Sequence, residues 1–311
     1  MINYVRHIEI DKNRWDDCIR GAINRRVYAF SWYLDVVCPG WDALVEDDYI
    51  SVFPLTHHHK WGIRYLYQPY FAQQLGVFSG TELPESTVTA FILAIPEKFR
   101  YLDIHLNSMN SYPGGTEIAT FRLNHELNLA ADHEKLTEKF AENTRRNIRK
   151  AQGFQITLTQ KTDVGELVGL FRDNFGRIER KLKDCHYETL RRLLVHCLAN
   201  HLGYITGAKT KDGNLSAAAF FLFDHAHVYL LFAASSAAAR DNGAMFLLID
   251  RFINDNAGRQ LVLDFEGGND PNLGRFYKSF GAVEIPYQTL HLNRLPAMVE
   301  RGLYFIRKLR K

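Results

Sequence analysis

LVLDFEGGNDPNLGRFYKSFG, residues 261–281, is the stretch that decides the fold of this chain. Its first three residues are apolar, as in a short buried strand, and the carboxylates Asp264 and Glu266 stand where that strand ends. After two glycines, Asn269-Asp270-Pro271 supplies two good N-cap residues and a proline suited to a first helical position. We therefore predict a strand, a polar loop and a short helix, Leu273 to Phe280, that stops at the next glycine.

This pattern has a functional and a structural interpretation. Carboxylates at the end of a strand, beside a helix that carries aromatic and basic residues, are typical of a reaction site. An ordinary strand–loop–helix connection would show the same residues. The stretch alone does not decide between the two.

Length and composition set the class of protein. A chain of 311 residues is long enough for two domains, and 46 % hydrophobic residues is ordinary for a globular protein. A net charge of +3 gives no strong general attraction to nucleic acid. The four cysteines are scattered, the N-terminus lacks an apolar signal core, and no apolar run is long enough to span a bilayer. We expect a soluble, cytoplasmic protein.

The two halves of the chain repeat the same order of predicted elements. Tyr49-Ile50-Ser51 aligns with Asn214-Leu215-Ser216, and Leu102-Asp103-Ile104 aligns with Leu263-Asp264-Phe265. The offset stays at about 160 residues, which indicates a duplicated domain. We predict a first domain at 1–135, a basic junction helix at 136–152, a second domain at 153–295 and a basic tail at 296–311; the resemblance described below implies a donor site in the second domain.

The junction, Ala141 to Lys150, is strongly basic. In a helix, Arg145 and Arg149 share one face, and Arg146 and Lys150 share another. These side chains fit a site for phosphate or another anion, because guanidinium groups bind phosphate oxygens in a bidentate way. A solvated helix with cations near its C-terminus would have the same sequence.

These residues together resemble a known family. A strand hairpin, the turn from Arg240 to Gly243, a strand that ends in Asp-Phe-Glu-Gly, and the block Arg-Phe-Tyr-Lys-Ser-Phe-Gly-Ala look like the Gcn5-related N-acyltransferase (GNAT) fold. The duplication, with Thr-Arg-Arg-Asn-Ile-Arg-Lys at the junction, resembles its Fem-type branch, which includes bacterial peptidyltransferases of the cell envelope. The resemblance implies an α+β (mixed α/β) fold of two tandem GNAT-like domains. Each would be a mixed, mostly antiparallel sheet flanked by helices.

The resemblance also implies a donor site. No cofactor would be bound permanently, and acyl-coenzyme A would be a co-substrate whose pantetheine arm enters between the strands at 228–234 and 261–265. Backbone N–H groups at the next helix N-terminus would hold its pyrophosphate. Met245 departs from the family pattern, which has a small residue there. The implied donor-binding residues are Ala233, Ala234, Arg240, Asn242, Gly243 and Ala244.

Four residues are the catalytic candidates. By resemblance, Tyr277 protonates a leaving thiolate, and Lys278 stands near the place of a helix lysine in the peptidyltransferases, where it would neutralise charge on the reacting carbonyl. The match to the family's helix can shift by one residue, so the role of Lys278 could belong to Tyr277 instead. Alternatively, Tyr277 is only an aromatic residue of the core. Glu266 or Asp264 would accept a proton from the attacking amine, or would cap the next helix.

The acceptor side is less defined. Tyr67 and Tyr70 belong to an aromatic stretch that we expect to shape an acceptor groove, and the junction arginines are candidates for phosphate. The C-terminal tail has five basic residues among residues 301–311, interleaved with apolar ones. Such a segment fits weak contact with an anionic membrane surface or a tRNA backbone, or a short terminal helix packed on the body.

Three functions therefore compete. The first is an N-acyltransferase that moves an acyl group from acyl-coenzyme A to an amine acceptor by direct attack. The second is Fem-type, aminoacyl-tRNA-dependent peptide-bond formation on a cell-wall precursor. The third is a non-catalytic binding protein with the same fold, which Met245 favours. We expect no metal site, because adjacent histidines at 57–59 alternate sides on a strand and have no partner ligands nearby in the sequence.

Overall fold

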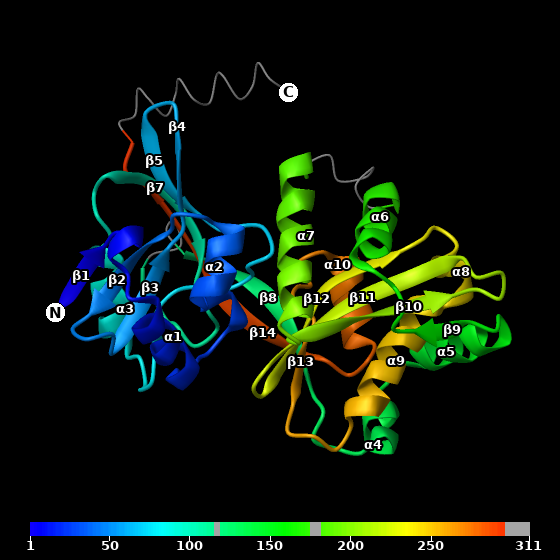
Figure 1. Ribbon diagram of the computed structural model, residues 1–311. Coiled ribbons are helices and arrows are strands. Elements are labelled where there is room, and N and C mark those ends of the chain that lie inside the picture. Colours follow the sequence, from blue (N-terminus) through cyan, green and yellow to red (C-terminus); the bar gives the residue numbers. More distant parts are fainter. Residues whose placement is uncertain (115–118, 175–181, 296–311) are drawn as a thin grey trace. The chain divides into compact units, whose positions relative to one another are not determined.

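The computed structural model describes residues 1–114, 119–174 and 182–295 (Figure 1). Contacts divide the chain into two units: Met1–Arg122 with the chain from Pro286 onward, and Leu123–Ile285. The chain passes between the units within two strands, β8 (Ala119–Asn128) and β14 (Val283–Asn293). The boundaries predicted at residues 135 and 295 thus lie elsewhere in this division, because the end of β14 pairs with a strand of the first unit.

The first unit combines two sheets with three α-helices among its described residues. Its elements are β1 (Ile2–Val5), α1 (Lys12–Gly21), α2 (Ser31–Val37), β2 (Asp42–Glu46), β3 (Ser51–Leu55), β4 (His57–Lys60), β5 (Ile63–Tyr67), β6 (Phe78–Ser79), α3 (Glu85–Leu93) and β7 (Phe99–His105). One sheet has the order β1-β2-β3-β6, and the other contains β4, β5, β7 and β14. Only Thr56 separates β3 from β4, and the two strands belong to different sheets.

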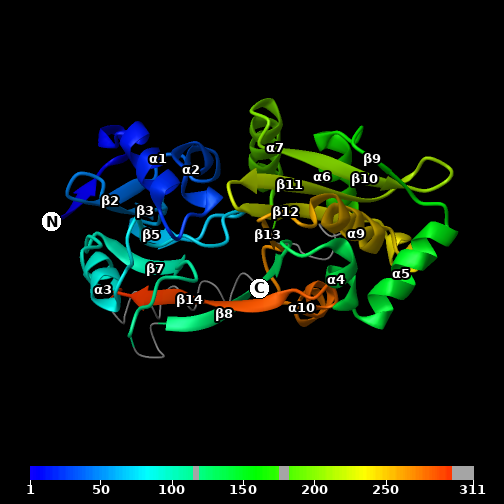
Figure 2. The ribbon, with the colours of Figure 1, turned by 90° about the horizontal axis from the view of Figure 1, so that it is seen from below.

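The second unit contains one sheet with helices on both faces. Besides the inner parts of β8 and β14, its elements are α4 (His133–Glu138), α5 (Glu142–Gly153), β9 (Thr157–Thr159), α6 (Val164–Asn174), α7 (Asp184–Ala199), β10 (Gly203–Lys209), β11 (Leu215–Asp224), β12 (His227–Ser235), α8 (Ala239–Asn242), α9 (Ala244–Asn256), β13 (Val262–Asp264) and α10 (Pro271–Lys278). The strand order is β8-β13-β12-β11-β10-β9. Helices α6 and α7 cover one face of this sheet and α9 covers the other, with α5 beside α9 (Figures 1 and 2).

Both units contain the same central arrangement. In the first, β5 and β7 are parallel neighbours and α3 lies between them in the chain; in the second, β12 and β13 are parallel and α9 lies between them. The remaining strand pairs that the structure describes are antiparallel. The predicted mixed, mostly antiparallel α+β fold is confirmed, and the element order predicted for each half is present in each unit.

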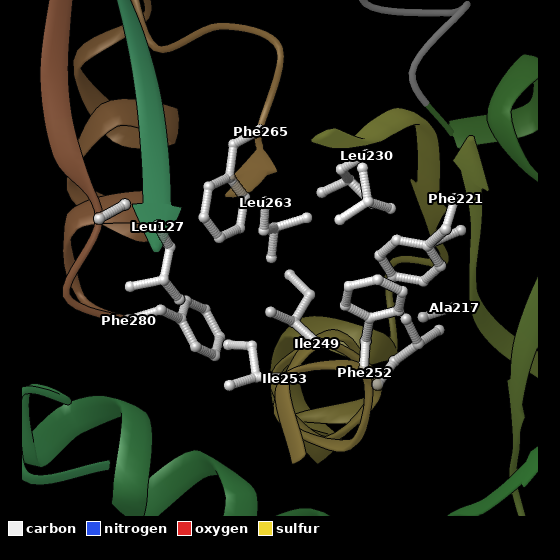
Figure 3. Close-up of a cluster of buried hydrophobic side chains, with 14 of the residues drawn as sticks. Leu127, Ala217, Phe221, Leu230, Ile249, Phe252, Ile253, Leu263, Phe265 and Phe280 are labelled. Atoms are coloured by element: carbon white, nitrogen blue, oxygen red, sulfur yellow. The ribbon is translucent and has the colours of Figure 1, made fainter. Parts of the chain in front are cut away.

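The core of the second unit lies between α9 and the sheet. Ile249, Phe252 and Ile253 of α9 point toward side chains of the strands (Figure 3). The ring of Phe252 stacks on that of Phe221, with centroids 3.7 Å apart and planes 9° from parallel. Burial of each such aromatic side chain stabilises the fold by about 1.5–3 kcal/mol. This core fixes α9 against β11 and β12.

Helix α10 begins at Pro271, two residues before the predicted Leu273, with the predicted cap and first-position proline. The Asp270 side chain accepts hydrogen bonds from the backbone N–H groups of Asn272 and Leu273, at 2.8 and 3.0 Å, and Pro271 is the first helical residue. The helix ends at Lys278, slightly earlier than predicted, and Gly281 then takes a left-handed conformation with φ 83°. The short helix is therefore held at both ends by local sequence.

Gly243, between α8 and α9, is predicted to be essential for packing. Its φ is +71°, and a Cβ there would lie 2.3 Å from the carbonyl oxygen of Asn147 in α5. Gly258 has φ +78° with nothing within 4 Å of a Cβ. Gly258→Ala should lower the free energy of unfolding by about 1–2 kcal/mol, the cost of the left-handed backbone. Gly243→Ala should cost about 1–3 kcal/mol more, because α5 must move. Urea unfolding measures both, and equal losses would contradict this packing.

Candidate active site

A β-bulge interrupts the pairing of β11 with β12. Phe220 pairs with Phe232 and Phe221 pairs with Leu230. Leu231 is therefore an extra residue in β12, with no pairing partner on β11. A bulge of this kind bends its strand and increases the local twist. The second half of β12 is therefore turned away from the direction of its first half.

The two parallel strands separate at the same place. β12 and β13 pair at three positions, the last of which places Tyr229 opposite Asp264. β13 ends there, whereas β12 continues to Ser235. From Leu230 onward, no described strand pairs with β12 on the side of β13.

A cavity of about 680 Å³ fills this opening, and its lining belongs wholly to the second unit. One wall is β12 from Leu230 to Ser235, and another is the start of α9 with Met245 and Phe246. Glu266 and Tyr277 line it from the β13–α10 connection and from α10. A largely apolar cavity with a few polar groups is the usual form of a small-molecule site.

The polar loop after β13 has an unusual backbone. Glu266 has φ +55°, and Gly267 and Gly268 follow at +151° and +128°. The Asp264 carboxylate accepts a hydrogen bond from the Glu266 N–H at 2.8 Å. A non-glycine residue in this region costs about 1–3 kcal/mol and persists only where its surroundings impose it. Such strain is concentrated at functional sites, and here it falls on a carboxylate that lines the cavity.

Strand β8 supplies the contacts that impose this conformation. The Gly267 N–H donates to the Asn124 side-chain oxygen at 3.1 Å, and the Gly267 carbonyl lies 2.8 Å from Nδ1 of His125. The Phe265 N–H donates to the His125 carbonyl at 3.0 Å. Asn124 and His125 are not among the residues that the sequence predicts. In the sequence they are only two adjacent polar residues of an extended segment, about 140 residues before the loop. The structure shows that both are buried.

Tyr277 faces the cavity. Its ring stacks on Phe265, with centroids 4.7 Å apart and planes 27° from parallel. Burial raises the pKa of its hydroxyl, and the nearby negative charges of Glu266 and Asp264 raise it further. Tyr277 therefore stays protonated at neutral pH and can donate a hydrogen bond into the cavity.

Lys278 lies on the outer side of α10. Its side chain is 52 % exposed, and Nζ is 3.1 Å from Oε1 of Glu284. It is not part of the cavity lining. Successive helical residues point about 100° apart, so only one of the two neighbours faces the cavity. Of these two candidates, Tyr277 is the one that lines the cavity, and the catalytic role of either stays a prediction.

The predicted pyrophosphate turn is a short helix, α8. Arg240 is exposed and lines the cavity. Asn242 is buried and structural: its Nδ2 donates to Ser216 at 2.8 Å and its Oδ1 accepts from the Ala244 N–H at 3.0 Å. Ala233 and Ala234 line the cavity from β12. Of the predicted donor-binding residues, Arg240 and the two alanines thus meet the cavity directly.

The backbone N–H groups of this region fall into two sets. Those of Ala239 to Gly243 donate to carbonyls within the same turn, and that of Ala244 donates to Asn242. Within the described residues, the N–H groups of Met245 and Phe246 in the first turn of α9 have no acceptor. These two groups, with Arg240, are the donors that an anion at the rim of the cavity would meet.

The basic junction helix, α5, makes mainly structural contacts. Arg145 donates to the carbonyls of Glu138 and Phe140, at 3.0 and 2.8 Å. Arg146 donates to the side chain of Asn143, and Arg149 pairs with Glu142 at 3.0 Å. These contacts already hold the guanidinium groups, and the phosphate role predicted for them stays a prediction.

Tyr67 and Tyr70 lie in the first unit. The Tyr67 hydroxyl donates to Sγ of Cys38 at 3.6 Å, and burial raises its pKa. Tyr70 is 46 % exposed. The acceptor role predicted for both stays a prediction. The basic C-terminal tail, residues 296–311, lies outside the described residues.

Comparison with known proteins finds a related domain family for part of the chain. Residues 138–279 match the acetyltransferase (GNAT) domain family. The matched residues lie within the second unit, Leu123–Ile285. No curated protein matches the sequence significantly.

Solved structures give the fold of the whole chain. The structure of FemX is similar over 94 % of this chain and 98 % of its own, with 13 % identity and a TM-score of 0.63. A conserved protein of unknown function from Bacteroides thetaiotaomicron covers 91 % of this chain and 92 % of its own, with 13 % identity and a TM-score of 0.52. The C-terminal domain of a putative lysylphosphatidylglycerol synthetase from Agrobacterium fabrum covers 94 % of both, with 11 % identity and a TM-score of 0.50. The predicted resemblance to the GNAT superfamily and its Fem-type branch is confirmed at the level of the fold.

Among the described residues, no helix is both long and apolar enough to cross a membrane.

The strain at Glu266 leads to a stability prediction. Glu266→Gly should raise the free energy of unfolding by about 1 kcal/mol, because glycine adopts the left-handed conformation without the Cβ penalty. Gln155, outside the cavity lining, has φ +54°, and Gln155→Gly is the matched control. Urea unfolding should show both variants to be more stable than the wild type. A less stable Glu266→Gly beside a more stable Gln155→Gly would show that the Glu266 side chain supports the fold.

Proposed function

We propose that the protein is an N-acyltransferase that moves an acyl group from an activated donor, acyl-coenzyme A, to an amine acceptor. The observation that carries this proposal is the cavity beyond the Leu231 bulge, where β12 and β13 have separated and where Glu266 and Tyr277 both belong to the lining. An extended pantetheine arm can pair with this part of β12 as an added strand would. The GNAT domain match agrees with this chemistry.

The residues divide the chemical work as follows. The amine nitrogen of the acceptor attacks the donor carbonyl, the C–N bond forms and the C–S bond breaks, with no covalent enzyme intermediate. Glu266 accepts the proton that the amine loses. Tyr277 donates a hydrogen bond to the leaving sulfur. A thiol has a pKa of about 8.5, well below the pKa of the Tyr277 hydroxyl. The hydrogen bond therefore stabilises the thiolate without full proton transfer.

The donor's phosphates would lie at the rim. They would accept hydrogen bonds from the free N–H groups of Met245 and Phe246, at the positive end of the α9 dipole, and from the Arg240 side chain. This is a smaller set than a glycine-rich phosphate turn offers, because the N–H groups from Ala239 to Ala244 already have acceptors.

That internal pairing favours a second candidate. A donor without a pyrophosphate beside the reacting group, such as an aminoacyl-tRNA, needs no such turn. The protein would then form a peptide bond on an amine of a cell-wall precursor, in the manner of the Fem-type branch. The same cavity would receive the aminoacyl group, and Glu266 and Tyr277 would keep their roles.

Calorimetric titration with acetyl-, octanoyl- and palmitoyl-coenzyme A, and with an aminoacyl-tRNA, tests the donor. We expect the wild type to bind at least one acyl-coenzyme A and Ala234→Trp, which fills the cavity beside β12, to lose that binding. Lys278→Ala, on the outer side of α10, is the control and should bind as the wild type does. Binding of aminoacyl-tRNA alone would favour the second candidate. Binding of neither donor would contradict both and leave the non-catalytic hypothesis.

Tyr277→Phe should lower kcat about 10²-fold or more, because it removes the hydrogen bond to the leaving group. The sequence predicts a loss for Lys278→Ala as well, but the structure limits its cost to an exposed ion pair, worth at most about 1 kcal/mol of stability. Thiol release from the bound donor, with a panel of amines, measures kcat, and thermal unfolding controls for folding. Equal activity of Tyr277→Phe and wild type would remove Tyr277 from the mechanism.

A further inference from the structure

His125 is a polar residue at a completely buried position. It lies on β8, its side chain has no exposed surface, and its ring centroid is 5.9 Å from that of Tyr277. Nδ1 is 2.8 Å from the Gly267 carbonyl oxygen. A carbonyl oxygen only accepts hydrogen bonds, so Nδ1 must carry the hydrogen, in the neutral as in the cationic imidazole.

Both polar groups of Gly267 are held from the same strand. The carbonyl accepts from His125, and the N–H donates at 3.1 Å to the side chain of Asn124. Glu266 is joined directly to this residue and is the carboxylate that lines the cavity. The position of that carboxylate therefore depends on how firmly β8 holds the next peptide group.

The imidazole also leaves the loop no room to relax. A Cβ on Gly268 would lie 2.1 Å from Nδ1, and a Cβ on Gly274 of α10 would lie 3.4 Å from Cε1. The ring thus packs against both the polar loop and α10, and the Gly268 carbonyl oxygen also lies beside Gly274, 2.9 Å from where its Cβ would be. Nε2 is buried, 3.8 Å from Oε1 of Glu284, and His125 is not among the residues that line the cavity.

We propose that His125 is a positioning residue: its Nδ1–H, by holding the Gly267 carbonyl, keeps Glu266 in the left-handed conformation that points its carboxylate at the acceptor amine. This rests on the proposed function for its effect on catalysis, whereas the effect on the loop is independent of it. The role assigned to His125 is to hold the loop through its Nδ1–H, which is committed to the Gly267 carbonyl.

Two variants distinguish the effect of the Nδ1–H hydrogen bond from the effect of the packing of the imidazole ring. Asparagine places an NH₂ group at the position of Nδ1, so His125→Asn retains the bond to Gly267. Glutamine places its NH₂ group near Nε2, so His125→Gln fills more of the ring volume but loses that bond. Thermal unfolding of both variants accounts for any general loss of packing.

The activity arm compares kcat and KM. His125→Gln should lower kcat about 10²-fold, the usual effect of a catalytic group displaced by about 1 Å. The KM for the donor should change little, and His125→Asn should restore most of kcat. Equal losses in the two variants would overturn the positioning role, as would wild-type kcat in His125→Gln.

The second experiment measures hydrogen exchange and requires no catalytic activity. Its result is therefore independent of the proposed function. Amide hydrogen exchange of residues 264–270, followed by mass spectrometry, should be faster in His125→Gln than in the wild type and unchanged in His125→Asn. Unchanged exchange in His125→Gln would overturn the inference even where acyl transfer is established. Faster exchange in a protein that transfers no acyl group would support the hold on the loop and contradict only the proposed function.

Discussion

One extra residue, Leu231, determines what the second unit can bind. Without the bulge at this position, β12 and β13 would continue as a parallel pair and close the sheet. With it, the pairing ends at Tyr229 and Asp264, and the rest of β12 lines a cavity. Every later feature of the site depends on this separation: α9 starts at one side of the opening, and the polar loop after β13 lies at the other. The rigid core of α9, with Ile249 and Phe252 packed on the sheet, keeps the opening from collapsing.

The polar loop illustrates how a strained segment is maintained. The left-handed Glu266 is unfavourable by itself. It persists because the loop's backbone groups have acceptors and donors on β8, a strand that the core holds in place through Leu127 and Leu129. The strain is thus offset by packing elsewhere in the unit. A carboxylate held in this way meets a substrate without first reorganising, which is the general advantage of a preorganised site.

Local sequence is sufficient for the features that depend on neighbours in the chain. Asp270 and Pro271 predict the start of α10 because capping involves residues two or three positions apart, and the glycine at 243 predicts the left-handed turn before α9. Features that depend on register or on distant strands are not predictable in this way. The bulge at Leu231 arises from the pairing of two strands, and the hold of Asn124 and His125 on the loop joins residues about 140 positions apart. The choice between Tyr277 and Lys278 required the rotation of α10, and the contacts of Arg145 required the carbonyls at the end of α4.

The central claim is that the space between β12 and β13 receives the activated donor. A crystal structure of the protein with a thioether analogue of acyl-coenzyme A, which cannot react, tests this most directly. The account predicts that the pantetheine arm runs along β12 between Leu230 and Ala234, with the carbon that replaces the reacting carbonyl near the Tyr277 hydroxyl. An analogue bound elsewhere on the protein, with this cavity left empty, would contradict the account.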